Sequence, residues 1–192
     1  MSNSKRFVIA DVFTEERFGG NQLAVFTDGS GLDSVTMQNI AREMNYSETT
    51  FLLPPEHGGD YRVRIFTPVH ELPFAGHPLV GSAYVIVAER MKEWSEPLTS
   101  VTLEAGVGPI HIEVRNEGGR LGRSTMTQPL PVVRGSYPDV AGLAKALSLD
   151  AFRIEQTGLP VETIFNGIAV MIVPVESRAD VPIRFRLTDD QG

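Results

Sequence analysis

The sequence contains no cysteine among its 192 residues. This absence excludes disulfide bonds, thiolate metal sites and any reaction that uses a cysteine of this chain as nucleophile or base. Basic residues are also scarce, because 17 Lys and Arg stand against 24 Asp and Glu, for a formal net charge of −7. A chain of that sign repels phosphate backbones, and no local cluster of Lys and Arg offsets it. We therefore expect no nucleic-acid partner.

Long hydrophobic runs are missing too. The longest apolar stretch, residues 80–88, is interrupted by Gly81, Ser82 and Tyr84, whereas a membrane-spanning helix needs about 20 apolar residues. Residues 1–6 are polar, and the apolar run after them is too short for the core of a signal peptide. We expect no membrane partner and a cytoplasmic location.

The chain nevertheless has enough apolar material for a folded core. Hydrophobic residues make up 42% of the sequence and charged residues 21%, a composition that excludes a wholly disordered chain. A length of 192 residues corresponds to one domain of ordinary size or to two small ones.

Two helices are predicted in the first 128 residues. One follows Asp33 or Ser34, either of which can cap it, because the next apolar residues recur at helical spacing: Met37, Ile40, Ala41 and Met44. The other begins near Pro78, a residue that suits the first turn of a helix, and extends to about residue 90. Its apolar residues surround it on nearly every side, which is typical of a buried helix rather than an amphipathic one.

Short strand-like runs account for most of the remaining sequence in this part of the chain. They lie near residues 7–12, 23–26, 49–53, 61–65, 99–103, 110–114 and 121–126. Many short strands with two helices are typical of an α+β fold and not of a regular βαβ series. We expect mostly antiparallel strands wrapped around the central buried helix.

The sequence after residue 128 predicts a second, smaller part. Residues 129–137 are rich in proline and are predicted to be a linker. Residues 138–192 then contain one helical stripe near 140–147, an apolar run over 164–173 with Asn166-Gly167 inside it, and an alternating pattern over 183–187. These elements are too few to cover one another, so we interpret them as the start of an incomplete second domain.

His77 is the histidine whose surroundings most favour chemistry. It lies between Gly76 and Pro78 at the N-terminus of the predicted buried helix, where free backbone N–H groups and the helix dipole favour an anion. The same field disfavours the imidazolium form, so a neutral imidazole that exchanges protons is one interpretation. The other is a histidine that merely caps the helix.

Glu48 lies at the entrance to the apolar run of residues 49–53, directly after Ser47. A single glutamate in such a place is most often ordinary surface. A buried glutamate has a raised pKa and can act as a general acid or base. Ser47 would supply a hydroxyl donor beside it.

Motifs for other kinds of chemistry are incomplete. His70-Glu71 resembles the start of the zinc motif H-E-x-x-H, but Phe74 stands where the second histidine is needed, and Pro73 would disrupt the helix that aligns the two ligands. A phosphate-binding glycine loop in its strand–helix context and a G-x-S-x-G nucleophile elbow do not occur in the sequence. We expect no metal site.

Six short motifs occur in a fixed order in the first part of the chain. They are DVF, GNQLAVF, IAREMN, SETTF, RIFTP and ELPFAGHP, at residues 11–13, 20–26, 40–45, 47–51, 64–68 and 71–78. As a set they resemble the N-terminal domain of the PhzF-like phenazine-biosynthesis family, which has the diaminopimelate-epimerase fold. The resemblance covers about residues 7–128 and becomes weaker beyond them.

This resemblance implies two similar domains, each a strongly curved sheet around a central helix, with the active site between them. It implies a small-molecule substrate, no cofactor, a homodimer, and an activity like that of trans-2,3-dihydro-3-hydroxyanthranilate isomerase. By the matching motifs, Glu48 resembles the family's acid/base and His77 the residue that assists proton transfer. Ser47 and Gly76 resemble its substrate-binding groups, and Asn21 resembles, more weakly, a residue that shapes the cleft. Epimerases of this fold use two cysteines, so their absence here favours isomerisation.

One family motif is missing. Family members carry an Asp followed by a Thr-Gly-Ser stretch late in the second domain, facing the glutamate, and residues 189–192 (DDQG) do not supply it. Two functions therefore stay open. The first is an isomerase whose full activity needs the absent half. The second is a non-catalytic module that binds a small acid or forms dimers through an exposed apolar face.

Overall fold

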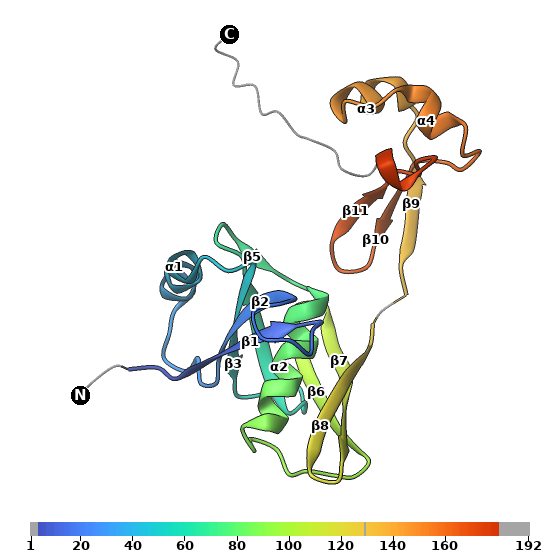
Figure 1. Cartoon of the computed structure of the whole chain (residues 1–192). Helices are drawn as coiled ribbons and strands as arrows, with labels where there is room; N and C mark the ends of the chain where they lie inside the picture. The colour runs from blue at the N-terminus through green and yellow to red at the C-terminus, as the bar shows by residue number, and fades with distance from the viewer. Residues whose placement is uncertain (1–3, 129, 181–192) are drawn as a thin grey trace. The chain divides into compact units, whose positions relative to one another are not determined.

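A computed structural model describes residues 4–128 and 130–180 of the chain (Figure 1). The chain forms two compact units, which we name the N-terminal unit (residues 1–128) and the C-terminal unit (residues 129–192). No helix among the described residues is long and apolar enough to cross a membrane.

The N-terminal unit is built on one eight-stranded sheet with the order β1-β2-β3-β4-β6-β7-β8, in which β5 pairs with β4. Its strands are β1 (Phe7–Val12), β2 (Asn21–Phe26), β3 (Glu48–Leu53), β4 (Tyr61–Phe66), β5 (Glu71–Leu72), β6 (Leu98–Ala105), β7 (Gly108–Glu117) and β8 (Arg120–Thr127). Two neighbouring pairs, β2 with β3 and β4 with β6, are parallel, and all the other pairs of this sheet are antiparallel. The predicted α+β class with a mostly antiparallel sheet is confirmed.

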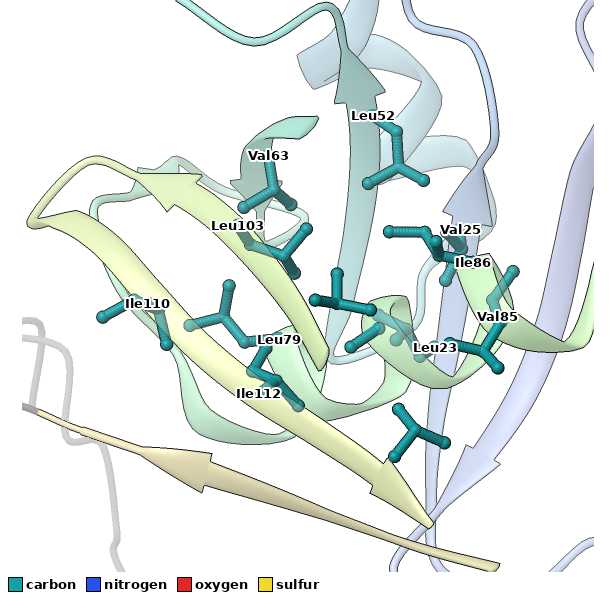
Figure 2. Packing of buried hydrophobic residues seen from close by; sticks show 14 of the residues in the cluster. Leu23, Val25, Leu52, Val63, Leu79, Val85, Ile86, Leu103, Ile110 and Ile112 are labelled. Carbon is teal, nitrogen blue, oxygen red and sulfur yellow. The ribbon is translucent and has the colours of Figure 1, made fainter. Parts of the chain in front are cut away.

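The central helix is α2 (Gly76–Ala88), and the curled sheet surrounds it (Figure 1). It contacts β1, β2 and β3 on one side of the sheet order and β6, β7 and β8 on the other. Leu79 and Ile86 are fully buried, and Figure 2 shows them among Leu23, Leu103 and Ile112 of the strands. The predicted buried helix is confirmed.

Two contacts hold α2 close to the first strands. Gly81 lets the helix approach β1 and β2, because a Cβ at this position would lie 2.6 Å from Leu23 Cδ2 and 2.8 Å from Val12 Cγ2. The buried hydroxyls of Thr50 in β3 and Ser82 in α2 form a hydrogen bond of 2.9 Å. This polar pair fixes which turn of the helix faces the start of β3.

α1 (Ser34–Met44) covers the outer face of the same sheet at β2, β3 and β4. Asp33 caps this helix by accepting a 2.7 Å hydrogen bond from the backbone N–H of Thr36, and Asn45 ends it in the left-handed conformation. Met37 and Ala41 are buried against the aromatic side chains of the outer face, which are Phe26, Phe51 and Phe66. The amphipathic helix predicted from its apolar stripe is therefore confirmed.

The C-terminal unit has a three-stranded antiparallel sheet with the order β11-β10-β9, together with two short helices. Its elements are β9 (Val132–Ser136), α3 (Val140–Ala146), α4 (Ala151–Glu155), β10 (Glu162–Phe165), β11 (Ala169–Ile172) and the 3₁₀ turn η1 (Arg178–Asp180). A small core gathers around Ala144, Ile154 and Val161. Every residue of β9 and β11 is exposed.

Three expectations about element boundaries need correction. Residues 132–136, expected within a linker, form β9, because their backbone pairs with β10 across a distance in sequence that local composition does not report. α4 was not expected; it is only five residues long and begins at an Asp150 cap. α2 begins at Gly76 and not at Pro78, which is tolerated because N–H groups of the first turn have no helical partner.

The Asn166-Gly167 dipeptide divides the predicted apolar run of 164–173 into the hairpin of β10 and β11, with Gly167 at a positive φ of 104°. The alternating pattern over residues 183–187 lies outside the described residues.

Candidate active site

Asn21 and Glu48 lie at the same end of two neighbouring strands. Asn21 is the first residue of β2 and Glu48 the first residue of β3. Because β2 and β3 are parallel, with Leu23 opposite Glu48, the starts of both strands meet at one edge of the sheet. Ser47, directly before β3, lies at the same edge.

Gly76 and His77 reach this edge from the N-terminus of α2. The N-cap residue, Ala75, offers no side-chain hydrogen bond to the helix, and His77 is inside the first turn. His77 is therefore not a capping residue. A Cβ on Gly76 would meet only Met126 Cε, at 3.9 Å, among atoms outside the backbone of its own helix, so other elements do not crowd this position.

The side chains of Glu48 and His77 lie next to each other. Glu48 Oε2 is 3.1 Å from His77 Nε2, and the two side chains are only 15% and 9% exposed. Their relative orientation is not that of a hydrogen bond, and both atoms are buried without a hydrogen-bond partner among the described residues. Buried polar atoms are nearly always paired, so this pair is free to bind a polar group from outside the protein.

Burial holds the pKa of His77 below its ordinary value, although the negative charge of Glu48 and the backbone carbonyl of Gln22 oppose that shift. The imidazole is therefore neutral at physiological pH. The sequence favoured the same protonation state through the field of the helix N-terminus, whereas desolvation is the larger cause in the folded chain.

Ser47 and Asn21 form a hydrogen-bonded chain that leads to the other nitrogen of the ring. The Ser47 hydroxyl donates to Asn21 Oδ1 over 2.6 Å. Asn21 Nδ2 lies 3.3 Å from His77 Nδ1. The structure thus brings together all five residues expected at the site, which are Asn21, Ser47, Glu48, Gly76 and His77.

Phe13 is a neighbour of the site that the residue-level reasoning missed. Its ring centroid is 6.4 Å from that of His77, its side chain is 77% exposed, and its φ is +66°. Left-handed backbone is costly for a residue with a large side chain. No pattern in the sequence predicts this backbone conformation. Phe13 was identified only as part of the DVF motif.

A second histidine–glutamate pair among the described residues, His111 Nε2 and Glu113 Oε1 at 3.9 Å, is about half exposed and therefore unlike the buried pair at the site. No group of three or more His, Asp or Glu side chains in residues 4–128 and 130–180 is arranged to hold a metal ion. Two hollows of about 450 and 440 Å³ open elsewhere on the N-terminal unit, the first near Glu104 and the second near Arg42. Neither is lined by Glu48 or His77.

Comparison with known proteins identifies the family. A model of the phenazine biosynthesis-like protein family (PhzC-PhzF) matches residues 10–190. The chain belongs to this family. The residues matched include both units and every residue of the candidate site.

A family relative, trans-2,3-dihydro-3-hydroxyanthranilate isomerase of Pseudomonas aeruginosa, is 40% identical over 174 residues, which are 91% of this chain and 58% of that protein. A second relative with the same name, from Pseudomonas fluorescens, is 42% identical over 84% of this chain and 54% of its own length. The chain therefore spans a little over half the length of these curated relatives.

Solved structures share the fold of this chain. The structure of a predicted epimerase from Pseudomonas aeruginosa has a TM-score of 0.83 and 33% identity, and the match covers 97% of this chain and 64% of that one. A probable proline racemase from Agrobacterium radiobacter, at 16% identity and a TM-score of 0.65, shares the fold only. The epimerase-like fold expected from the motifs is thus confirmed.

Proposed function

We propose that this chain supplies the glutamate–histidine half of an isomerase that needs no cofactor. The reaction class is the transfer of one proton between two carbons of a small, carboxylate-bearing substrate, with migration of a double bond. The observation that carries the proposal is the buried Glu48–His77 pair, whose facing atoms, Oε2 and Nε2, lie 3.1 Å apart and have no hydrogen-bond partner among the described residues. The names of the two Pseudomonas relatives support the same class.

Glu48 is the acid/base of the proposed reaction. Its carboxylate takes a proton from one substrate carbon, the electrons of that C–H bond form the new double bond, and the old double bond accepts the proton back from Glu48 at its far carbon. The step is balanced without an oxidant or reductant. One carboxyl group can serve both carbons when they lie on the same face of the substrate.

The neighbouring groups bind and orient the substrate in this proposal. The first backbone N–H groups of α2, at Gly76 and His77, have no helical acceptor and suit a substrate carboxylate. The absence of a side chain at Gly76 leaves room for that approach. Homodimer formation and a cytoplasmic location, expected from the resemblance and the composition, are further parts of this proposal.

The decisive test is proton exchange between the substrate and deuterated water. Glu48→Gln keeps the shape of the side chain and removes its ability to take a proton. In a protein that contains the complete cleft, with trans-2,3-dihydro-3-hydroxyanthranilate as substrate, we expect exchange to be abolished while ligand affinity stays within about tenfold, or about 1.4 kcal/mol. Mass spectrometry measures the exchange and calorimetry the affinity.

The matched control is Glu43→Gln, which makes the same change on the exposed face of α1. It should leave exchange unchanged. Undiminished exchange in Glu48→Gln would remove Glu48 from its proposed role. Binding without exchange in the protein with the complete cleft and an intact Glu48 would favour the other function, a non-catalytic binder of small acids.

A further inference from the structure

The hydrogen bonds on the far side of His77 point to a role for Ser47 and Asn21 that differs from substrate contact. Ser47 precedes β3, Asn21 begins β2, and His77 lies in α2, so three separate elements converge. Two consecutive contacts share the Asn21 amide: Ser47 Oγ contacts Asn21 Oδ1, and Asn21 Nδ2 contacts His77 Nδ1.

The distances decide which way the Asn21 amide faces. Oxygen and nitrogen of an amide are distinguished by their hydrogen-bond partners. The 2.6 Å separation from Ser47 Oγ is typical of O–H···O bonds, whose distances are about 2.5–3.0 Å, and is short for an N–H···O bond. The amide oxygen therefore faces Ser47, and the amide NH₂ faces the ring.

This amide orientation determines which nitrogen of the ring carries the proton. The Asn21 NH₂ group is a donor, so at 3.3 Å it favours the form of His77 in which Nδ1 is an acceptor. A neutral imidazole then holds its proton on Nε2, the nitrogen that lies 3.1 Å from Glu48 Oε2. The backbone carbonyl of Gln22 acts against this arrangement. It is a hydrogen-bond acceptor, so it favours a proton on the ring nitrogen that faces it.

We propose that Ser47 and Asn21 are positioning residues that hold His77 in its Nε2–H form, so that the ring nitrogen beside Glu48 already carries a proton and Glu48 is the base. A ring nitrogen that already bears a proton cannot take one from the substrate. The Ser47 hydroxyl donates its one proton to Asn21 Oδ1 and therefore does not donate to the substrate. The catalytic consequence of this arrangement rests on the proposed function, whereas the position of the ring proton is a property of the folded chain.

The test is a long-range ¹H–¹⁵N correlation spectrum of the 192-residue chain labelled at histidine, recorded near pH 8. His77→Gln assigns the His77 signals by their disappearance. We expect Nδ1 to resonate as an unprotonated nitrogen and Nε2 as a protonated one. A protonated Nδ1 in the natural chain would overturn the proposal.

Variants of the chain of hydrogen bonds sharpen the test. Asn21→Asp replaces the donor by an acceptor, and we expect the proton to move to Nδ1. Asn39→Asp, the same change on the exposed face of α1, is the matched control and should change nothing. An unaltered His77 spectrum in folded Asn21→Asp would contradict the proposal.

Ser47 provides a second route should Asn21→Asp fail to fold. Ser47→Ala frees the amide to rotate, so we expect signals of both ring forms, and Ser47→Thr restores the hydroxyl and the single form. A single, unchanged form in Ser47→Ala would overturn the role of Ser47. The proposed function can fail separately. In that case the protein with the complete cleft shows no substrate exchange, although the His77 ring still has its Nε2–H form.

Discussion

The N-terminal and C-terminal units differ in how much of their sheet is covered. In the N-terminal unit both faces of the sheet are packed at β2, β3 and β4, one against α2 and the other against α1, and side chains as large as Phe51, Phe66 and Leu79 are fully buried. In the C-terminal unit the buried cluster has three members, Ala144, Ile154 and Val161, and β9 and β11 are exposed along their whole length.

The difference shows why the candidate site belongs to the N-terminal unit. A buried pair of titratable side chains and a chain of hydrogen bonds need elements whose positions are determined by packing on both sides. β2, β3 and α2 have such packing. The small sheet of the C-terminal unit has exposed residues at every position of two of its three strands.

The largest effect expected from this comparison comes from truncating a branched side chain that is buried in one unit and exposed in the other. Ile112→Ala in β7, where Ile112 is fully buried, should lower the free energy of unfolding by about 2–5 kcal/mol. Ile172→Ala in β11, where the side chain is 47% exposed, should change it by no more than about 0.5 kcal/mol. Urea unfolding measures both, and equal losses would contradict the contrast.

A glycine pair tests the backbone of the site at a smaller scale. Gly20 has a φ of +63°, and a Cβ there would lie 2.2 Å from the Val12 carbonyl oxygen, whereas Gly31, with a φ of +78°, has no atom within 4 Å of its Cβ position. Both alanine variants incur the left-handed backbone cost of about 1–2 kcal/mol. Gly20→Ala should lose about 1–3 kcal/mol more, because the backbone must shift.

The measurement is the difference in unfolding free energy between Gly20→Ala and Gly31→Ala. The shift in Gly20→Ala should also disturb the signals of the adjacent Asn21 and of its partner His77 in the nuclear magnetic resonance spectrum. Similar losses in the two variants would mean that the turn before β2 is not sterically determined.

The smallest effect is the pH dependence contributed by His77. Its pKa is lowered in the folded chain, mainly by burial, so the unfolded chain binds more protons as the pH falls below about 6.5, the ordinary value. His77 therefore opposes folding at acid pH: stability falls as the pH drops through 6.5 and levels off below the folded-state pKa. His77→Gln should lack this part of the profile.

Urea titrations of the natural chain and of His77→Gln between about pH 5 and 8 measure that difference. Because the site lies in the N-terminal unit, the effect should appear in the unfolding of that unit. A difference between the two proteins that does not vary with pH would contradict the burial of a neutral imidazole.

Local patterns in the sequence predicted much of the N-terminal unit. Strand β1 and the cap and apolar stripe of α1 follow from short-range rules, and the apolar surroundings of α2 predicted its burial. The C-terminal unit was less predictable. β9 lacks a clear alternation and is a strand because β10 pairs with it, and α4 is too short for a helical period to be visible.

The candidate site shows the same division. The sequence alone indicated Glu48 and His77 as candidates for acid–base chemistry. It also placed His77 at the start of a buried helix, because the signals for a helix start lie within a few residues of it. It left open whether Glu48 is buried, and no pattern connected Asn21 with His77, which are 56 positions apart.

Periodicity and capping depend on neighbours a few residues away, and the sequence therefore determined which segments are helices and strands and which of their faces are apolar. The meeting of Asn21, Ser47, Glu48 and His77 depends on the parallel pairing of β2 with β3 and on the close approach of α2 that Gly81 permits. Only the tertiary structure decided these contacts, because they result from packing between distant segments.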